Sequence, residues 1–76
     1  MAANGYSAKV VLQLVVGGNT FSLSHVGSRD IIVRDECSEI PATDAEIHVS
    51  VNDKRSIRKV FLPYGISGPR RPILFL

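Results

Sequence analysis

The strongest constraint on the fold lies between residues 45 and 62. In the stretch AEIHVSV, residues 45–51, apolar side chains occupy every second position. This period of two predicts a half-buried strand, because successive side chains of a strand point to opposite faces of the sheet. After the polar segment NDKR, residues 52–55, apolar residues return as far as Leu62. The sequence therefore predicts a β-hairpin over residues 45–62, with its turn in residues 52–55.

The second strand of this hairpin does not alternate cleanly. Ile57 and Val60 have opposite parity, and the pair Arg58–Lys59 lies between them. A β-bulge at Arg58–Lys59 would place both apolar residues on the core face and both charges outside. We therefore predict a bulge there, with Phe61 pointing away from the core.

Four further segments have the composition of strands, because branched and aromatic side chains dominate them. Gly17-Gly18-Asn19 and Gly27-Ser28 supply turn residues between the first three. The connection over residues 36–43 contains Pro41, which cannot donate to a strand ladder, so we expect the chain to cross there to another sheet or edge. The four segments are residues 8–16, 20–26, 29–35 and 70–76.

One of these segments, residues 20–26, has an irregularity of its own. Strict alternation from Phe21 and Leu23 would place His25 on the inward face and Val26 on the outward face. A bulge near His25, or a frayed strand end, would restore the apolar residue to the core.

Six short antiparallel strands define an all-β fold class. A chain of 76 residues makes one domain and leaves no room for two. Strands of this kind bury their apolar faces against one another as a small barrel or a two-sheet sandwich, and the sequence leaves both open. We expect a single domain over residues 1–76, with the small and polar residues 1–7 frayed.

Cysteine usage and hydropathy bear on the environment of the protein. Cys37 is the only cysteine, so the chain cannot form an internal disulfide, which favours the cytoplasm. No apolar run reaches the ~18 residues that a membrane-spanning helix needs, so we expect no membrane partner. The apolar run after Lys9 is interrupted by Gln13 and lacks the small-x-small cleavage site of a signal peptide.

The charges are unevenly distributed along the chain. All seven acidic residues lie between residues 29 and 53, whereas residues 54–76 contain six basic residues and no acid. Opposite charges on neighbouring strands could neutralise each other across a solvated sheet. Alternatively, the bases form a face for single-stranded nucleic acid or another polyanion, with Phe61 and Tyr64 as stacking platforms. The candidate polyanion-binding residues are Lys54, Arg55, Arg58, Lys59, Arg70 and Arg71.

Side chains suited to catalysis or metal binding are sparse. His25, Cys37 and His48 are the only imidazole and thiol groups, and their spacing matches no compact zinc pattern. Ser24 and His25 are neighbours on a predicted strand, so their side chains point to opposite faces and cannot pair. We predict no catalytic residue, no metal and no cofactor, and a small hydrolase using the carboxylates of residues 35–39 is only a third alternative.

Apolar residues near the C-terminus favour a non-catalytic interaction module. Contiguous exposed apolar patches usually mark an interface, and a terminal strand can add to a sheet edge in another chain. We therefore expect binding to a protein partner or self-association through an edge strand, with nucleic acid as the alternative partner. The candidate partner-binding residues are Phe61, Tyr64, Leu74 and Phe75.

Overall fold

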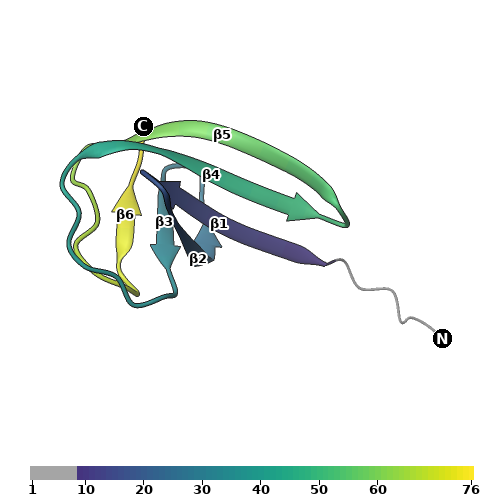
Figure 1. The fold of residues 1–76 in the computed structure, drawn as a ribbon, viewed down its shortest axis with the longest axis horizontal. Helices are drawn as coiled ribbons and strands as arrows, with labels where there is room; N and C mark the ends of the chain where they lie inside the picture. The colour runs from purple at the N-terminus through teal and green to yellow at the C-terminus, as the bar shows by residue number, and fades with distance from the viewer. Residues whose placement is uncertain (1–8) are drawn as a thin grey trace.

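The fold is built from six β-strands (Figure 1). The structure is a computed structural model that describes residues 9–76, so the predicted fraying of residues 1–7 lies outside the described residues. Residues 9–76 contain no helix with the length and apolar character of a membrane span. The strands are β1 (Val10–Val16), β2 (Asn19–Val26), β3 (Asp30–Val33), β4 (Thr43–Val51), β5 (Lys54–Leu62) and β6 (Pro72–Leu74).

The six strands form one antiparallel sheet that curls into a half-barrel. Its strand order is β5-β4-β1-β2-β3-β6, so the connection after β3 carries the chain across β1 and β2, as the sequence predicts. Curling brings the two ends of the sheet together: the Phe61 N–H donates to the Leu76 carbonyl over 3.0 Å, and the Leu76 N–H donates to the Phe61 carbonyl over 2.8 Å. The all-β fold class is confirmed, and curvature of a single sheet buries the apolar face.

Two of the strand pairs are joined by two-residue turns. Val16 pairs with Asn19 around Gly17, whose φ is 59°. The turn of the β4–β5 hairpin consists of Asn52 and Asp53, with φ angles of 51° and 71°. Two-residue hairpin turns require such positive φ angles because their twist must match that of the strands, and Gly, Asn and Asp tolerate them best. The hairpin turn is thus shorter than the four residues predicted.

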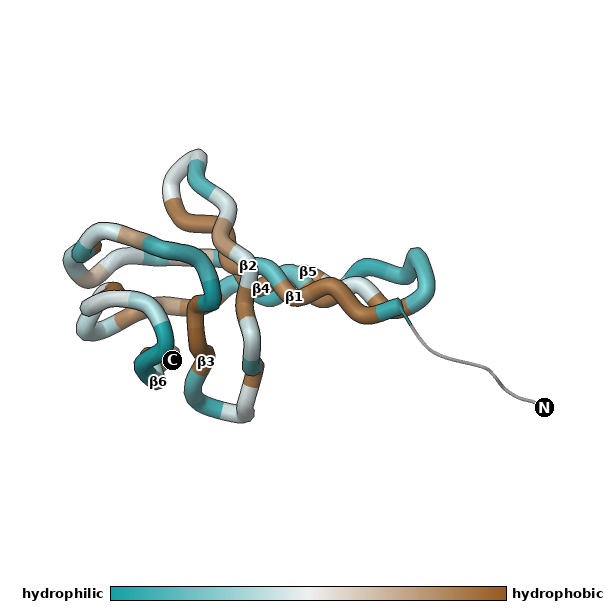
Figure 2. The backbone as a smooth tube through the Cα atoms, turned by 90° about the horizontal axis from the view of Figure 1, so that it is seen from below, coloured by the Kyte–Doolittle hydropathy of each residue, from teal (hydrophilic) through white to brown (hydrophobic). Residues whose placement is uncertain are grey.

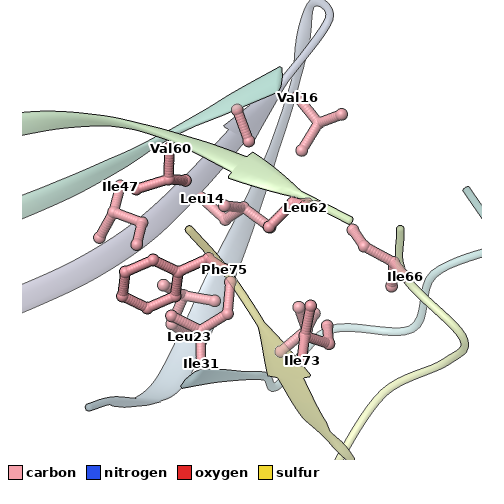
Figure 3. Packing of buried hydrophobic residues seen from close by; sticks show 12 residues of the cluster. Leu14, Val16, Leu23, Ile31, Ile47, Val60, Leu62, Ile66, Ile73 and Phe75 are labelled. Atoms are coloured by element: carbon pink, nitrogen blue, oxygen red, sulfur yellow. The ribbon is translucent and has the colours of Figure 1, made fainter. Parts of the chain in front are cut away.

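The core lies inside the curve of the half-barrel (Figure 3). Alternate residues of β1 and β4 face it, as the period of two predicts. Phe75, after β6, and Ile66, in the loop after β5, complete this cluster together with the strands. The buried apolar residues are Leu14, Val16, Leu23, Ile31, Val33, Ala45, Ile47, Val60, Leu62, Ile66, Ile73 and Phe75.

The predicted bulge at Arg58–Lys59 is wrong. The β4–β5 ladder runs along the whole of β5 without a register shift. Val60 therefore faces the core, whereas the side chain of Ile57 is 55% exposed. The tight turn fixes the register, and an unbroken ladder keeps Ile57, Lys59 and Phe61 together on the outer face. Phe61 does point away from the core, with 41% of its side chain exposed.

The predicted bulge near His25 is confirmed. The pairing between β2 and β3 shifts register between Leu23 and His25. The shift turns Val26 back toward the core, against which it packs.

The free end of the β4–β5 hairpin projects from the half-barrel together with the start of β1 (Figures 1 and 2). β2 pairs with β1 only from Gln13 onward, so within the described part of the chain the first residues of β1 pair with β4 alone. Asn52 ties the two together, because its N–H donates to the Lys9 carbonyl over 3.0 Å and its Oδ1 accepts the Lys9 N–H over 2.9 Å. The result is a three-stranded ribbon with β4 in the middle and with β1 and β5 on its two sides.

The connection between β3 and β4 is held by the loop after β5. Ile40 and Ile66 form an isolated bridge, in which each N–H donates to the other carbonyl over 2.9 Å and 2.8 Å. Gly65, with a φ of 62°, lies directly against the backbone of Ile40. Because Ile66 is 1% exposed, this bridge closes one end of the core.

Strands β3 and β6 are shorter than the segments predicted for them. At the end of β3 the Arg34 N–H still donates to the Ser22 carbonyl over 2.8 Å. The next partner of Ser22 is a side chain, since its N–H donates to Asp35 Oδ2 over 2.7 Å. The Asp35 carboxylate thus takes the place of a backbone carbonyl as the acceptor for Ser22, and the β2–β3 ladder ends there.

Candidate interaction surface

β5 is an edge strand along most of its length. On one side it pairs with β4, and on the other, among residues 9–76, only Phe61 has a strand-like partner, Leu76. The N–H and C=O groups of a strand alternate in direction, so those of Arg55, Ile57 and Lys59 point the same way as those of Phe61. Within the part of the chain that the structure describes, no strand pairs with these residues from that side. We call this row of outward backbone groups, from Arg55 to Lys59, the β5 edge.

Four basic side chains flank the β5 edge. Lys54 and Arg58 project from the face of β5 that lies inside the curve of the sheet, whereas Arg55 and Lys59 project from the outer face. All four residues are exposed. A partner strand beside β5 would therefore meet positive charge on both of its faces.

Within the part of the chain that the structure describes, these bases have no acidic partners. Among residues 9–76, no ion pair involves a base of β5. Glu46, which lies opposite Lys59 in the ladder, engages His48 instead: Glu46 Oε1 and His48 Nε2 are 2.9 Å apart. Arg58 has an aromatic contact, because its guanidinium lies 5.2 Å from the ring centre of Phe75. Arg58 therefore also covers the core, whereas the other three bases of β5 have neither an ion pair nor a ring contact among the described residues.

The remaining predicted bases lie elsewhere. Arg70 and Arg71 precede β6 at the end of that strand remote from the C-terminus and from β5 (Figure 1). Arg70 Nη2 lies 3.9 Å from Glu36 Oε1, and both side chains are well exposed. The structure thus divides the six predicted bases into a group of four on β5 and a separate pair.

The predicted partner-binding residues are also divided. Phe61, Tyr64 and Leu74 are 41%, 76% and 50% exposed. Phe75 is 3% exposed and belongs to the core, so its side chain is not available to a partner. Leu76, which belongs to the apolar C-terminal segment but is not one of the predicted partner-binding residues, is 77% exposed beside Phe61.

An open groove with a volume of about 740 Å³ adjoins the β5 edge. Lys59, Phe61 and Leu76 line it together with the carboxylates of Asp44 and Glu46. The groove is open to solvent. The groove extends the surface that a macromolecular partner could cover next to β5.

The imidazole and thiol groups are dispersed. His25 Nε2 lies 3.4 Å from Asp30 Oδ1 at the β2–β3 turn. Burial raises the pKa of the half-buried Cys37 thiol, and the neighbouring carboxylates of Glu36 and Asp35 raise it further. Within residues 9–76, no three His, Cys, Asp or Glu side chains gather as a metal site requires. In the same range, no side-chain hydrogen bond joins a serine or cysteine to an imidazole.

No protein-family model, curated protein or solved structure matches the chain. The most distinctive feature of the protein surface is the β5 edge with its four flanking bases.

Proposed function

We propose that this protein is a non-catalytic interaction module that binds a protein partner by adding a strand of the partner to the β5 edge. The observation that supports this proposal is the row of outward N–H and C=O groups on Arg55, Ile57 and Lys59. An unpaired sheet edge is a template for another strand, to which main-chain hydrogen bonds contribute affinity and side chains contribute specificity.

The chain itself provides an example of this bonding. Phe61 and Leu76 exchange two backbone hydrogen bonds, as the residues of a hydrogen-bonded antiparallel pair do. A partner strand antiparallel to β5 would continue this pattern at the next outward residues of the β5 edge. The exposed side chains of Ile57 and Phe61 lie on the outer face beside it and offer apolar contact.

Substituting Ile57→Pro should prevent strand addition. Proline removes the outward N–H of residue 57 while the inward groups of Ser56 and Arg58 keep their bonds to β4, and an edge position whose N–H faces solvent is where a strand tolerates proline. The matched control, Ile57→Ala, shortens the side chain and keeps the N–H. We would select binders from a displayed library of short random peptides and measure their affinities for the three proteins.

Selected peptides should bind the Ile57→Pro variant about tenfold more weakly than the wild type and should bind Ile57→Ala nearly normally. Circular dichroism would verify that the proline variant is folded. If it is not, peptides N-methylated at alternate residues test the same point with the unmodified protein. Strand addition would be ruled out if no peptide binder is recovered. It would also be ruled out if neither the proline substitution nor N-methylation of the peptides lowers their affinity.

A second candidate function is binding of single-stranded nucleic acid or another polyanion. The four bases of β5 without acidic partners favour it. The double substitution Arg55→Glu/Lys59→Glu should lower the salt concentration at which the protein elutes from heparin. Arg70→Glu/Arg71→Glu makes the same change in net charge at the separate pair and should have a smaller effect. The wild type should lose retention steeply with salt, and no retention at low salt would exclude this function.

The setting that we propose for this function is the cytoplasm. Cys37 is the only cysteine in the chain, so no internal disulfide can form. Its raised pKa favours the protonated thiol, which is the less reactive form. A reducing compartment would suit a domain stabilised without disulfides.

A further inference from the structure

We infer that the β5 edge accepts an acidic extended segment, with carboxylates on both faces of the added strand. This inference rests on the proposed strand addition and specifies the chemistry of the partner. It is carried by two observations at the same place: outward backbone groups from Arg55 to Lys59, and four flanking bases with no ion-pair partner among the described residues.

The charges select the partner because they flank the edge on both faces. A strand docked beside β5 removes water from the neighbouring side chains, so a neutral or basic strand would leave these charges desolvated and uncompensated. Opposite charges directly across a strand pair stabilise it, whereas like charges destabilise it. An acidic strand would compensate all four bases without any change in the sheet.

Antiparallel pairing with β5 predicts a sequence pattern for the acidic partner strand. In the antiparallel register centred on Ile57, successive partner residues lie opposite Lys59, Arg58, Ile57, Ser56, Arg55 and Lys54. The expected pattern is therefore two acids, one apolar residue, one small residue and two more acids. The apolar residue would pack on Ile57, which is 55% exposed.

A second copy of this chain fits the β5 edge poorly. Antiparallel pairing of two β5 strands around Ile57 would place Arg55 of one copy opposite Lys59 of the other, which is a like-charge contact. The acidic connection after β3 is already engaged within its own copy. Asp35 accepts a backbone N–H of β2, and Glu36 lies 3.9 Å from the guanidinium that precedes β6.

The test uses three capped peptides that differ only in charge. They are Glu-Glu-Val-Thr-Glu-Glu, its Gln-Gln-Val-Thr-Gln-Gln analogue and its Lys-Lys-Val-Thr-Lys-Lys analogue. Titration of the ¹⁵N-labelled protein by NMR would give the affinities and would identify the amides that shift. We expect the acidic peptide to bind roughly tenfold more tightly than the neutral one, with the largest shifts at the amides of Arg55, Ile57 and Lys59.

Two variants and one modified peptide sharpen the result. Arg55→Glu/Lys59→Glu should reverse the preference toward the basic peptide, whereas Arg70→Glu/Arg71→Glu should preserve the preference for the acidic one. Arg58 is left unchanged because it also covers Phe75. N-methylation of the peptide valine, whose N–H would point at β5, should abolish binding, and N-methylation of the threonine, whose N–H points away, should not.

The outcomes separate this inference from the function on which it rests. Equal binding of acidic and neutral peptides, with shifts at the β5 edge, would overturn the acidic preference and keep strand addition. If the acidic peptide binds equally well with and without N-methylation, and heparin binds as tightly as the peptide, strand addition is overturned. Binding of a polyanion would then replace it. No binding by any peptide would overturn both, and the bases would then serve only to keep the edge from pairing.

Discussion

Replacing Leu14 by alanine should reduce the free energy of unfolding by about 2–5 kcal/mol. Leu14 is completely buried in β1, a central strand, and pairs with Phe21 on one side and Ile47 on the other. The substitution removes apolar contact and leaves a cavity that neighbouring strands cannot close without losing their register. A domain of this length has only about 4–11 kcal/mol of stability, so the loss is a large fraction of it.

The matched control for this prediction is Val11→Ala in the same strand. Val11 lies on the opposite face and is 39% exposed, so its truncation should cost less than about 1 kcal/mol. Urea denaturation followed by circular dichroism would give both values. Similar losses for the two variants would show that the inner face of β1 does not form the core.

A methyl group added at Gly65 should destabilise the protein by about 2–5 kcal/mol. Gly65 has a φ of 62°, and a Cβ there would overlap the carbonyl oxygen of Ile40 and come within 2.6 Å of the carbonyl carbon of Pro41. These are backbone atoms, so they can move only if the Ile40–Ile66 bridge opens. Opening it would expose Ile66, which is otherwise buried.

Gly17→Ala is the matched control, because it isolates the cost of the backbone conformation. Gly17 also has a positive φ, 59°, but a Cβ there meets no atom within 4 Å. Alanine at this turn should therefore cost only about 1–2 kcal/mol, the penalty for a left-handed L-residue. Thermal unfolding of both variants would measure the difference, and equal melting temperatures would contradict the close approach of Gly65 to Ile40.

The two bulge predictions show where sequence reasoning succeeds on local irregularities and where it fails. Near His25 an out-of-phase apolar residue, Val26, is drawn into the core by a real bulge. At Ile57 the same argument fails, because the β4–β5 ladder continues past this residue without a register shift and leaves it 55% exposed on the outer face. An apolar residue out of phase with the alternation therefore does not by itself show whether the strand forms a bulge or leaves that residue exposed.

The candidate site was predictable only in part. The sequence indicates a run of bases in the second strand of the hairpin, and the structure places all four beside one strand edge. The sequence does not indicate that Arg70 and Arg71 lie apart from the bases of β5. Nor does it indicate that Phe75 is buried while Leu76 is exposed. These facts depend on how β6 meets β3 and on where the chain passes β5.

The amino-acid sequence alone determined the all-β class, the hairpin over residues 45–62 and the alternation that divides β1 and β4 into a core face and an outer face. These properties are local, since they follow from backbone geometry and from neighbouring side chains. Only the tertiary structure decided that one sheet curls into a half-barrel, and that Leu76 bonds to Phe61 while, among residues 9–76, no strand covers the side of Arg55, Ile57 and Lys59 that faces away from β4. Which edge of a sheet stays open depends on contacts between residues far apart in the chain, and no periodicity within a strand encodes them.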